Sequence, residues 1–148
     1  MQLGGAVKNI LAIAAGIVDG SNLGANARSA LITRGLAEMM RLGEVVGAKA
    51  NTLMGLAGVG DLVLTCTDVQ SRNHRFGVLL GQGLTVTAAL KQIGQVVEGV
   101  KTTDCIQRLR THHAVDMPIT QCVFEVLQGQ ITIQQAVQQL MARPLRFE

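Results

Sequence analysis

The sequence is poor in aromatic residues: it has no Trp, no Tyr and only three Phe among 148 residues. A hydrophobic core must therefore be built mainly from Ala, Val, Ile, Leu and Met. The formal net charge is a mild +3, and no run of Lys or Arg stands out. Proteins that bind nucleic acid combine a basic surface with aromatic side chains on which bases stack. We therefore expect no nucleic-acid partner.

Cysteine is also scarce, with Cys66, Cys105 and Cys122 far apart and odd in number. No C-x-x-C pair occurs, so the sequence predicts neither a disulfide framework nor a zinc site, and no other metal site. Reduced thiols of this kind are typical of a cytoplasmic protein.

Long apolar runs are missing as well. The most apolar stretch, residues 6–18, is interrupted by Lys8 and Asn9 and ends at Asp19. It is too short to span a bilayer, and it lacks the basic start and the cleavage pattern of a signal peptide. We expect no membrane span.

With two prolines and few alternating apolar runs, the sequence predicts an all-α protein, a multi-helix bundle that forms one domain over residues 1–148. Within residues 25–46 the charged positions, Glu38 and Arg41 among them, are expected largely on the face away from the apolar side. The expected helices cover about 6–18, 25–46, 52–56, 72–81, 87–93, 102–113, 118–128 and 133–142. The stretch 19–24 is expected to be a loop, and Ser71 and Thr132 are expected N-caps.

The first helix is apolar nearly all round and yet carries Lys8. Burial disfavours the ammonium form, and a neutral amine can accept a proton, so Lys8 is a candidate general base. The alternative is that Lys8 lies near the start of the helix and extends its ammonium group to water.

The helix after Ser71 is a candidate anion site. Its first N–H groups and its positive dipole end favour an anion, Arg72 adds a fork of donors, and Asn73 adds an amide. The alternative is a capped surface helix with a solvated Arg. Upstream, the glycine-rich turn GLAGVGDL at 55–62 ends near Asp61; its spacing is not that of a dinucleotide fingerprint, and Asp61 alone is more typical of a turn or a helix cap.

Five stretches, in this order, resemble the bacterial-type NAD(P)-dependent glycerol-3-phosphate dehydrogenases. They are GAVKNI at 5–10, TRGLAEM at 33–39, GLAGVGDL at 55–62, SRN at 71–73 and VEG at 97–99. The resemblance covers the C-terminal helical half of such an enzyme, similar to the helical domain of the 6-phosphogluconate dehydrogenase superfamily. The N-terminal Rossmann domain of the family is absent, since no βαβ unit and no G-x-G-x-x-G is present.

The resemblance implies reversible hydride transfer between NAD or NADP and the glycerol 3-phosphate/dihydroxyacetone phosphate pair, feeding glycerophospholipid synthesis. It implies that Lys8 is the catalytic base. The implied substrate-binding residues are Lys8, Asp61, Ser71, Arg72 and Asn73, and the implied cofactor contacts are Arg72, Val96 and Glu98. One departure is His74, where many relatives place a second Arg; this makes the neighbourhood less cationic near neutral pH.

The resemblance also implies two partners, an N-terminal Rossmann domain and a second copy in a homodimer. Without the Rossmann domain we expect no dehydrogenase activity, because hydride transfer needs the nicotinamide held against the substrate. A different class of function stays open, a helical oligomerisation or interaction module without chemistry. A third, another sugar-phosphate or 2-hydroxy-acid dehydrogenase, does not account for the turn at 55–62 followed by Ser71-Arg72-Asn73.

Overall fold

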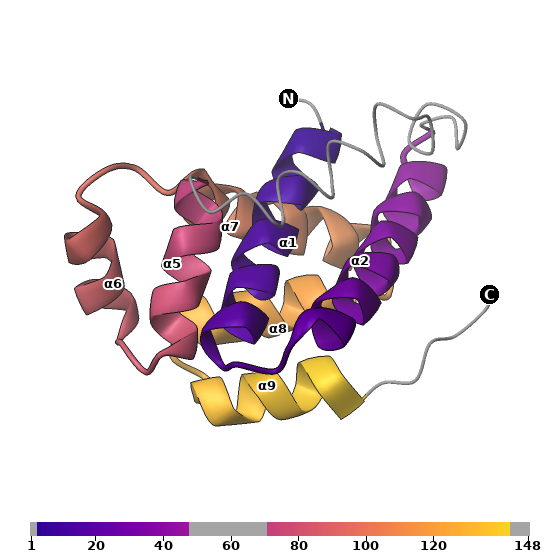
Figure 1. The fold of residues 1–148 in the computed structure, drawn as a ribbon. Coiled ribbons are helices and arrows are strands. Elements are labelled where there is room, and N and C mark those ends of the chain that lie inside the picture. Colours follow the sequence, from indigo (N-terminus) through magenta and orange to yellow (C-terminus); the bar gives the residue numbers. More distant parts are fainter. Residues whose placement is uncertain (1–2, 48–70, 143–148) are drawn as a thin grey trace.

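The computed structural model describes residues 3–47 and 71–142, and every regular element in these ranges is a helix. This confirms the predicted all-α bundle for the part of the chain that is described (Figure 1). The short helix expected near residue 52 lies outside it. The helices are α1 (Leu3–Gly20), α2 (Ala25–Val45), α5 (Arg72–Gly81), α6 (Val86–Ile93), α7 (Glu98–His112), α8 (Pro118–Leu127) and α9 (Ile133–Ala142).

Helix α1 forms the centre of the molecule. Its residues Val7, Ile10, Ile13 and Ile17 are completely buried. It packs against α2, α5, α7 and α8 (Figure 1). A helix that is apolar all round is stable only when it is covered on every side, so the surrounding helices follow from this one segment. Towards the N-terminal end of α1 the cover is thinner, and Lys8 is half-buried there.

Glycines bring α1 and α5 into backbone contact. Gly16 and Gly20 of α1 face Gly77 and Gly81 of α5, and a Cβ atom added to Gly16 would lie 2.8 Å from the Val78 nitrogen. Real Cβ atoms do not approach so closely, so no larger residue fits without moving a helix. The crossing therefore fixes where α5 begins relative to α1.

Two helix starts lie where their caps predict. The Ser71 Oγ accepts a hydrogen bond from the His74 N–H at 3.3 Å, at the start of α5. At the start of α9, the Thr132 Oγ1 accepts from the Gln135 N–H at 3.1 Å and the Gln135 Oε1 accepts from the Thr132 N–H at 2.8 Å. These reciprocal bonds form a capping box, as the sequence indicates.

Helix α7 begins at Glu98 and not at Thr102, so the predicted start was wrong. The residue before it, Val97, has no side chain that could cap the helix. Instead the Oδ1 of Asn73, on α5, accepts a hydrogen bond from the Gly99 N–H at 2.8 Å. A cap from another helix leaves no signal in the local sequence.

The expectation that Glu38 lies on the outer face of α2 was also wrong. Glu38 is 1% exposed, and its carboxylate oxygens accept hydrogen bonds from the N–H groups of Ile119 at 2.7 Å and Thr120 at 3.3 Å. These are first-turn donors of α8, whose N-cap residue Met117 has no capping side chain. Glu38 therefore caps α8 from α2, and its burial is tolerated because both oxygens are hydrogen-bonded.

Burial raises the pKa of Glu38 to about 7, although the bonds from Ile119 and Thr120 and the nearby charge of Arg41 lower it. Between about pH 4.5 and pH 7 the folded chain thus holds a proton that the unfolded chain releases. The stability from Glu38 is fully present below pH 4.5 and is lost as pH rises through 7. The loss is about 3 kcal/mol in the free energy of unfolding, at about 1.4 kcal/mol per pKa unit.

We expect Glu38→Gln to remove this pH dependence, because the amide cannot titrate. The measurement is urea unfolding of the wild type and the variant at several pH values from 4.5 to 8. Glu44→Gln, on the exposed side of the same helix, is the matched control and should keep the wild-type slope. A Glu38→Gln variant with the wild-type slope would contradict the assignment.

The two cysteines in the described ranges, Cys105 and Cys122, are free thiols, as the sequence predicts; Cys66 lies outside these ranges. Burial raises the pKa of the Cys122 thiol to about 12. Residues 3–47 and 71–142 contain no cluster of His, Cys, Asp and Glu that could hold a metal ion. None of the described helices has the length and apolar character needed to cross a bilayer.

Candidate active site

Three helices meet at one end of the molecule. The starts of α5 and α7 lie beside the N-terminal half of α1 (Figure 1). This is the end where Lys8, Ser71, Arg72 and Glu98 are found. The candidate site is therefore built from segments that are far apart in the sequence.

Asn73 joins these three helices. It is buried, and its Nδ2 donates a hydrogen bond to the Asn9 Oδ1 of α1 at 3.2 Å. Its Oδ1 accepts from the Gly99 N–H of α7. A Cβ atom on Gly99 would lie 2.8 Å from this Oδ1 and 2.6 Å from the Ile13 Cδ1, so a larger residue here would have to displace the Asn73 amide and the Ile13 side chain. The side-chain amide of Asn73 thus holds α1, α5 and α7 together at the candidate site.

We expect Asn73→Ala to lower the free energy of unfolding by about 1–3 kcal/mol, because it leaves the buried Gly99 N–H and the partly buried Asn9 Oδ1 without their partner. Chemical unfolding of the variant measures this directly. Asn26→Ala, at an exposed position in the first turn of α2, is the control and should change stability by about 0.5 kcal/mol or less. A loss of stability no larger than that of the control would show that the bridge is not important for the fold.

Lys8 precedes Asn9 on α1 and is half-buried. Val7 and Ile10 of the same helix are completely buried, and the next residue, Asn9, accepts the hydrogen bond from Asn73 of α5. This location suits an amine that exchanges a proton with a bound molecule.

Ser71 and Arg72 offer hydrogen-bond donors at the start of α5. The Ser71 oxygen accepts the capping bond from His74, so its own O–H can donate elsewhere. Arg72 is exposed in the first turn of α5, and the described residues give it no hydrogen bond or ion pair. The N-termini of α5 and α7 add two positive dipole ends to the same region. A phosphate or carboxylate would find several donors here.

The other predicted residues fall into three groups. Glu98 is exposed as the first residue of α7, and Val96 is 52% exposed in the segment between α6 and α7, so both lie at the edge of the candidate site. Asp61 lies outside the described residues. Asn73, predicted to contact substrate, has both atoms of its amide bonded within the protein, which makes it a positioning group first.

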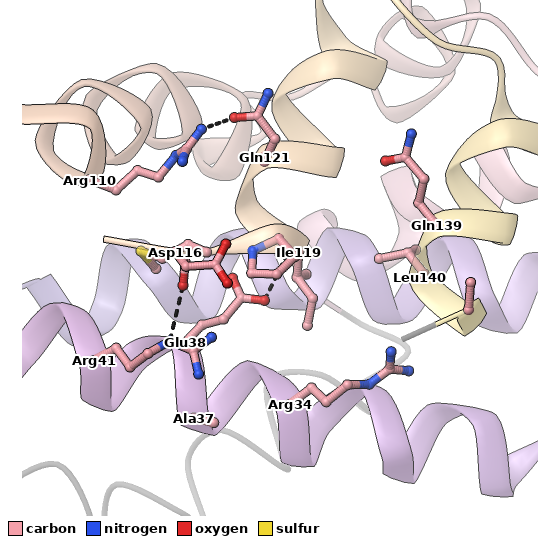
Figure 2. A pocket seen from close by; sticks show the side chains of 13 residues that line it. Arg34, Ala37, Glu38, Arg41, Arg110, Asp116, Ile119, Gln121, Gln139 and Leu140 are labelled. Atoms are coloured by element: carbon pink, nitrogen blue, oxygen red, sulfur yellow. Dashed lines mark hydrogen bonds between the residues drawn. The ribbon is translucent and has the colours of Figure 1, made fainter. Parts of the chain in front are cut away.

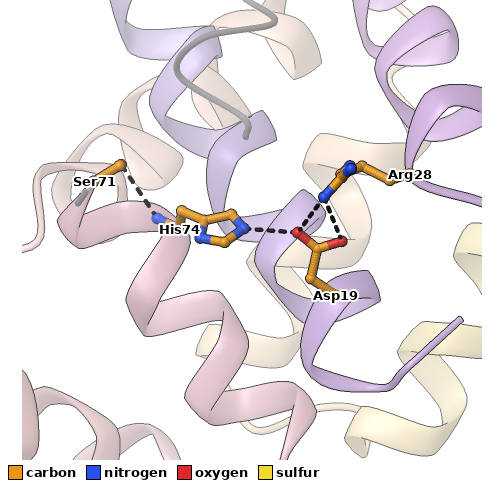
Figure 3. Close-up of polar contacts among 4 residues, drawn as sticks. All are labelled: Asp19, Arg28, Ser71 and His74. Carbon is orange, nitrogen blue, oxygen red and sulfur yellow. Dashed lines mark hydrogen bonds and ion pairs between the residues drawn. The ribbon is translucent and has the colours of Figure 1, made fainter. Parts of the chain in front are cut away.

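His74 points away from the candidate site, towards the C-terminal end of α1 (Figure 3). Its Nε2 lies 2.8 Å from the Asp19 Oδ2, which also pairs with the Arg28 guanidinium at 3.3 Å. The sequence placed Asp19 in a loop, but α1 continues to Gly20. This cluster ties α1, α2 and α5 together, and it directs the His74 side chain away from the candidate anion site.

The roles of Asn9 and Gly99 were not predicted from the sequence. Asn9 was visible as a polar residue inside an apolar helix, a pattern that often marks a buried hydrogen bond. Gly99 directly after an acidic helix start was the second signal. Neither could be paired with Asn73 without the fold.

Comparisons with known proteins all point to the same family. A sequence model described as "NAD-dependent glycerol-3-phosphate dehydrogenase C-terminus" matches residues 1–138. A Halorhodospira halophila protein named glycerol-3-phosphate dehydrogenase [NAD(P)+] is 55% identical over the whole chain, which spans 45% of that protein. The chain thus spans less than half the length of this curated relative.

Solved structures agree with the sequence match. The crystal structure of a glycerol-3-phosphate dehydrogenase from Coxiella burnetii is 57% identical, with a TM-score of 0.92 over 96% of this chain and 44% of the other. The yeast glycerol-3-phosphate dehydrogenase is 26% identical, with a TM-score of 0.82 over 93% of this chain and 40% of the other. The predicted helical fold is shared by both.

Proposed function

Because the chain belongs to the family of NAD-dependent glycerol-3-phosphate dehydrogenases, whose C-terminal part it matches, we propose that it is the substrate-binding and catalytic-base half of such an enzyme. The reaction proposed is the interconversion of sn-glycerol 3-phosphate and dihydroxyacetone phosphate, at the start of glycerophospholipid synthesis. The observation that carries the proposal is the match to the family over residues 1–138. The placement of Lys8 beside the α5 and α7 helix starts supports it.

The phosphate of the substrate is proposed to bind at the start of α5. Arg72 offers a planar fork of donors, and the Ser71 hydroxyl and first-turn N–H groups add shorter bonds. Asn73 holds this helix start against α1 and α7. The resemblance adds Asp61 as a further substrate contact, and Asp61 remains a proposal on that ground alone.

Lys8 is proposed to handle the proton on the C2 oxygen. In the oxidation direction its Nζ accepts the hydroxyl proton while the hydrogen on C2 leaves with both bonding electrons, which gives the ketone. In the reduction direction the ammonium group returns that proton to the developing alkoxide. The nicotinamide of NAD or NADP supplies the hydride acceptor or donor.

The described residues fit only the edge of a dinucleotide site. They contain no strand, so no βαβ unit can bind the pyrophosphate within them. Exposed Val96 and the Glu98 carboxylate, which can accept from a ribose hydroxyl, are the proposed contacts together with Arg72. The rest of the cofactor is proposed to lie on an N-terminal Rossmann domain.

Three further proposals concern the domain organisation, the location and the oligomeric state. Residues 1–148 are proposed to form one domain, which the single core cluster of the described residues supports. A cytoplasmic location is proposed because the free thiols Cys105 and Cys122 suit a reducing compartment. A homodimer is proposed because large apolar side chains, Leu23, Val45 and Val46, are more than a third exposed.

The experiment is complementation. The chain is mixed with the separately produced N-terminal domain of the Coxiella burnetii relative, and oxidation of NADH or NADPH by dihydroxyacetone phosphate is followed. We expect turnover from the mixture and none from either half alone, because neither holds both reactants. A mixture that assembles and stays inactive would contradict the proposal, and in that case self-association of the chain would favour the interaction module.

A further inference from the structure

Helices α5 and α6 enclose a cavity of about 410 Å³. The two helices pack on each other and run in opposite directions along one side of the bundle (Figure 1). Arg75, in the first turn of α5, lines the cavity, and it follows Arg72 by one turn, so the two side chains are neighbours on the helix surface. The cavity therefore begins beside the candidate anion site and extends away from it, along α5, to Gln82.

One wall of this cavity is apolar. It is formed by Val78 and Leu79 of α5 and by Ile93 of α6. Ile93 is buried in the core, and Val78 lies at the glycine crossing, where its carbonyl group faces Gly20 of α1. The central helix thus fixes the position of this wall. A wall of branched aliphatic side chains suits a planar ring, and the volume is in the range of small-molecule sites.

Three exposed polar side chains line the same cavity, Arg75, Gln82 and Gln92. None of them makes a side-chain hydrogen bond or an ion pair in the part of the chain that the structure describes. Among the residues of these ranges that line the cavity there is no carboxylate. The Asp19 carboxylate, bonded to the ring of the lining residue His74, is also paired with a guanidinium of α2. An anion in the cavity therefore meets an arginine without an opposing acidic lining residue.

The cavity between α2, α8 and α9 is different, because its charged groups are bonded within the protein (Figure 2). The Arg41 Nε donates to the Asp116 backbone oxygen at 3.0 Å, and the Arg110 guanidinium is bonded to the Gln121 Oε1. Glu38 uses both carboxylate oxygens to cap α8. The α5–α6 cavity, in contrast, offers polar groups that a ligand can bind.

The spacing of these polar groups indicates the kind of ligand. Gln82 directly follows the last residue of α5 and is about 10 Å from Arg75 along the helix axis, at 1.5 Å per residue. A guanidinium binds phosphate through paired hydrogen bonds, whereas the amide of a Gln side chain both donates and accepts and can pair with the edge of adenine. In a nucleotide the ribose separates the phosphate from the base. This length fits an arginine and an amide at the two ends of an apolar wall.

We propose that the α5–α6 cavity binds a nucleoside monophosphate unit, with its phosphate at Arg75 and its base against Val78, Leu79 and Ile93. Gln82 hydrogen-bonds the edge of the base. The unit is a free nucleotide or the nucleotide half of a dinucleotide, because the recognised chemistry is the same in both. The site does not take part in the proton and hydride transfers of the dehydrogenase reaction.

The test follows the binding of adenosine 5′-monophosphate to the full chain, by calorimetry and by the amide chemical shifts of Leu79, Gln82 and Gln92. Adenosine and inorganic phosphate serve as partial ligands. We expect the nucleotide to bind about tenfold or more tightly than either, because it alone contacts both the guanidinium and the apolar wall. Inorganic phosphate binding as tightly would mean an anion site only, and adenosine binding as tightly would mean an apolar crevice only; both would overturn the proposal.

Arg75→Gln should weaken the nucleotide by about tenfold or more and leave adenosine within twofold, because it removes a charged hydrogen-bond donor. Arg108→Gln removes the same charge from α7 at a side chain that is 81% exposed, and should leave nucleotide binding within twofold. An equal loss in the two variants would mean a general charge effect. Thermal unfolding of each variant confirms that the fold is kept.

Gln82→Ala separates this cavity from the candidate anion site at the start of α5. We expect it to weaken the nucleotide but not inorganic phosphate, whereas Gln138→Ala, at an exposed position of α9, should change neither. No shift of Leu79, Gln82 and Gln92 in the folded wild type would exclude the site. Shifts confined to the starts of α5 and α7 would place the nucleotide elsewhere and would also overturn the proposal.

NADH distinguishes the two sources of the nucleotide. If NADH causes the same shifts and competes with adenosine 5′-monophosphate, the cavity takes the nucleotide half of the cofactor. If the monophosphate binds and NADH does not, the cavity takes a separate nucleotide. Both results support the site, and neither requires turnover, so this test can fail or succeed independently of the complementation experiment.

Discussion

Replacing Lys8 by methionine is expected to lower kcat for the reduction of dihydroxyacetone phosphate by about 10²–10⁴-fold in the complemented enzyme. Methionine has a similar length and is apolar, so it can take the place of the aliphatic part of the half-buried Lys8 side chain. What it removes is the amine that exchanges the C2 proton. The effect should fall on kcat far more than on KM, since the phosphate is proposed to bind at α5.

Steady-state kinetics of wild type and variant provide the measurement, with Lys91→Met as the matched control. Lys91 is an exposed lysine on α6, and its loss should leave kcat within twofold. Added small primary amines should restore part of the activity of Lys8→Met and none in the control. A Lys8→Met variant with wild-type kcat would remove Lys8 from the mechanism.

Substituting Gly77 by alanine is expected to lower the free energy of unfolding by about 3 kcal/mol. A Cβ atom there would overlap the Ile13 carbonyl oxygen and lie 2.9 Å from the Gly16 Cα. Since both neighbours are backbone, α1 and α5 must separate. At about 2–4 °C for each kcal/mol in a chain of this size, the melting temperature should fall by roughly 6–12 °C.

Gly5→Ala separates this clash from the general effect of alanine. Gly5 is also in a helix, α1, but a Cβ atom there has no neighbour within 4 Å. Alanine should therefore be neutral or should stabilise by up to about 1 kcal/mol, through its higher helix propensity. Thermal unfolding of the two variants side by side decides the matter, and equal melting temperatures would refute the proposed tight crossing.

Local signals allowed much of the fold to be predicted. Ser71, Thr132 and Pro118 mark helix starts through bonds or constraints within a few residues, and the starts of α5, α8 and α9 were correct. The start of α7 and the burial of Glu38 were not predictable. Both depend on hydrogen bonds between residues that are distant in the sequence, and periodicity alone assigns a Glu to the solvent.

The same division applies to the candidate site. Lys8 could be selected because an ammonium group is anomalous in an apolar helix, and Ser71-Arg72 because a capped helix start with a cation suits an anion. Their assignment to one reaction came from the resemblance to a family. Asn9 and Gly99 could not be given a role from the sequence, because their function is to meet Asn73 from two other helices.

The two caps between distant helices bear on how the chain folds. Glu38 on α2 satisfies the first turn of α8, and Asn73 on α5 satisfies the first turn of α7. Neither later helix has a capping side chain of its own, so its first turn gains these bonds only after the earlier helix has docked. Because such long-range contacts close large loops, they form late and make unfolding cooperative. The helices of this bundle are thus expected to gain and lose their structure together, and a peptide covering α7 and α8 alone should be largely unfolded in water.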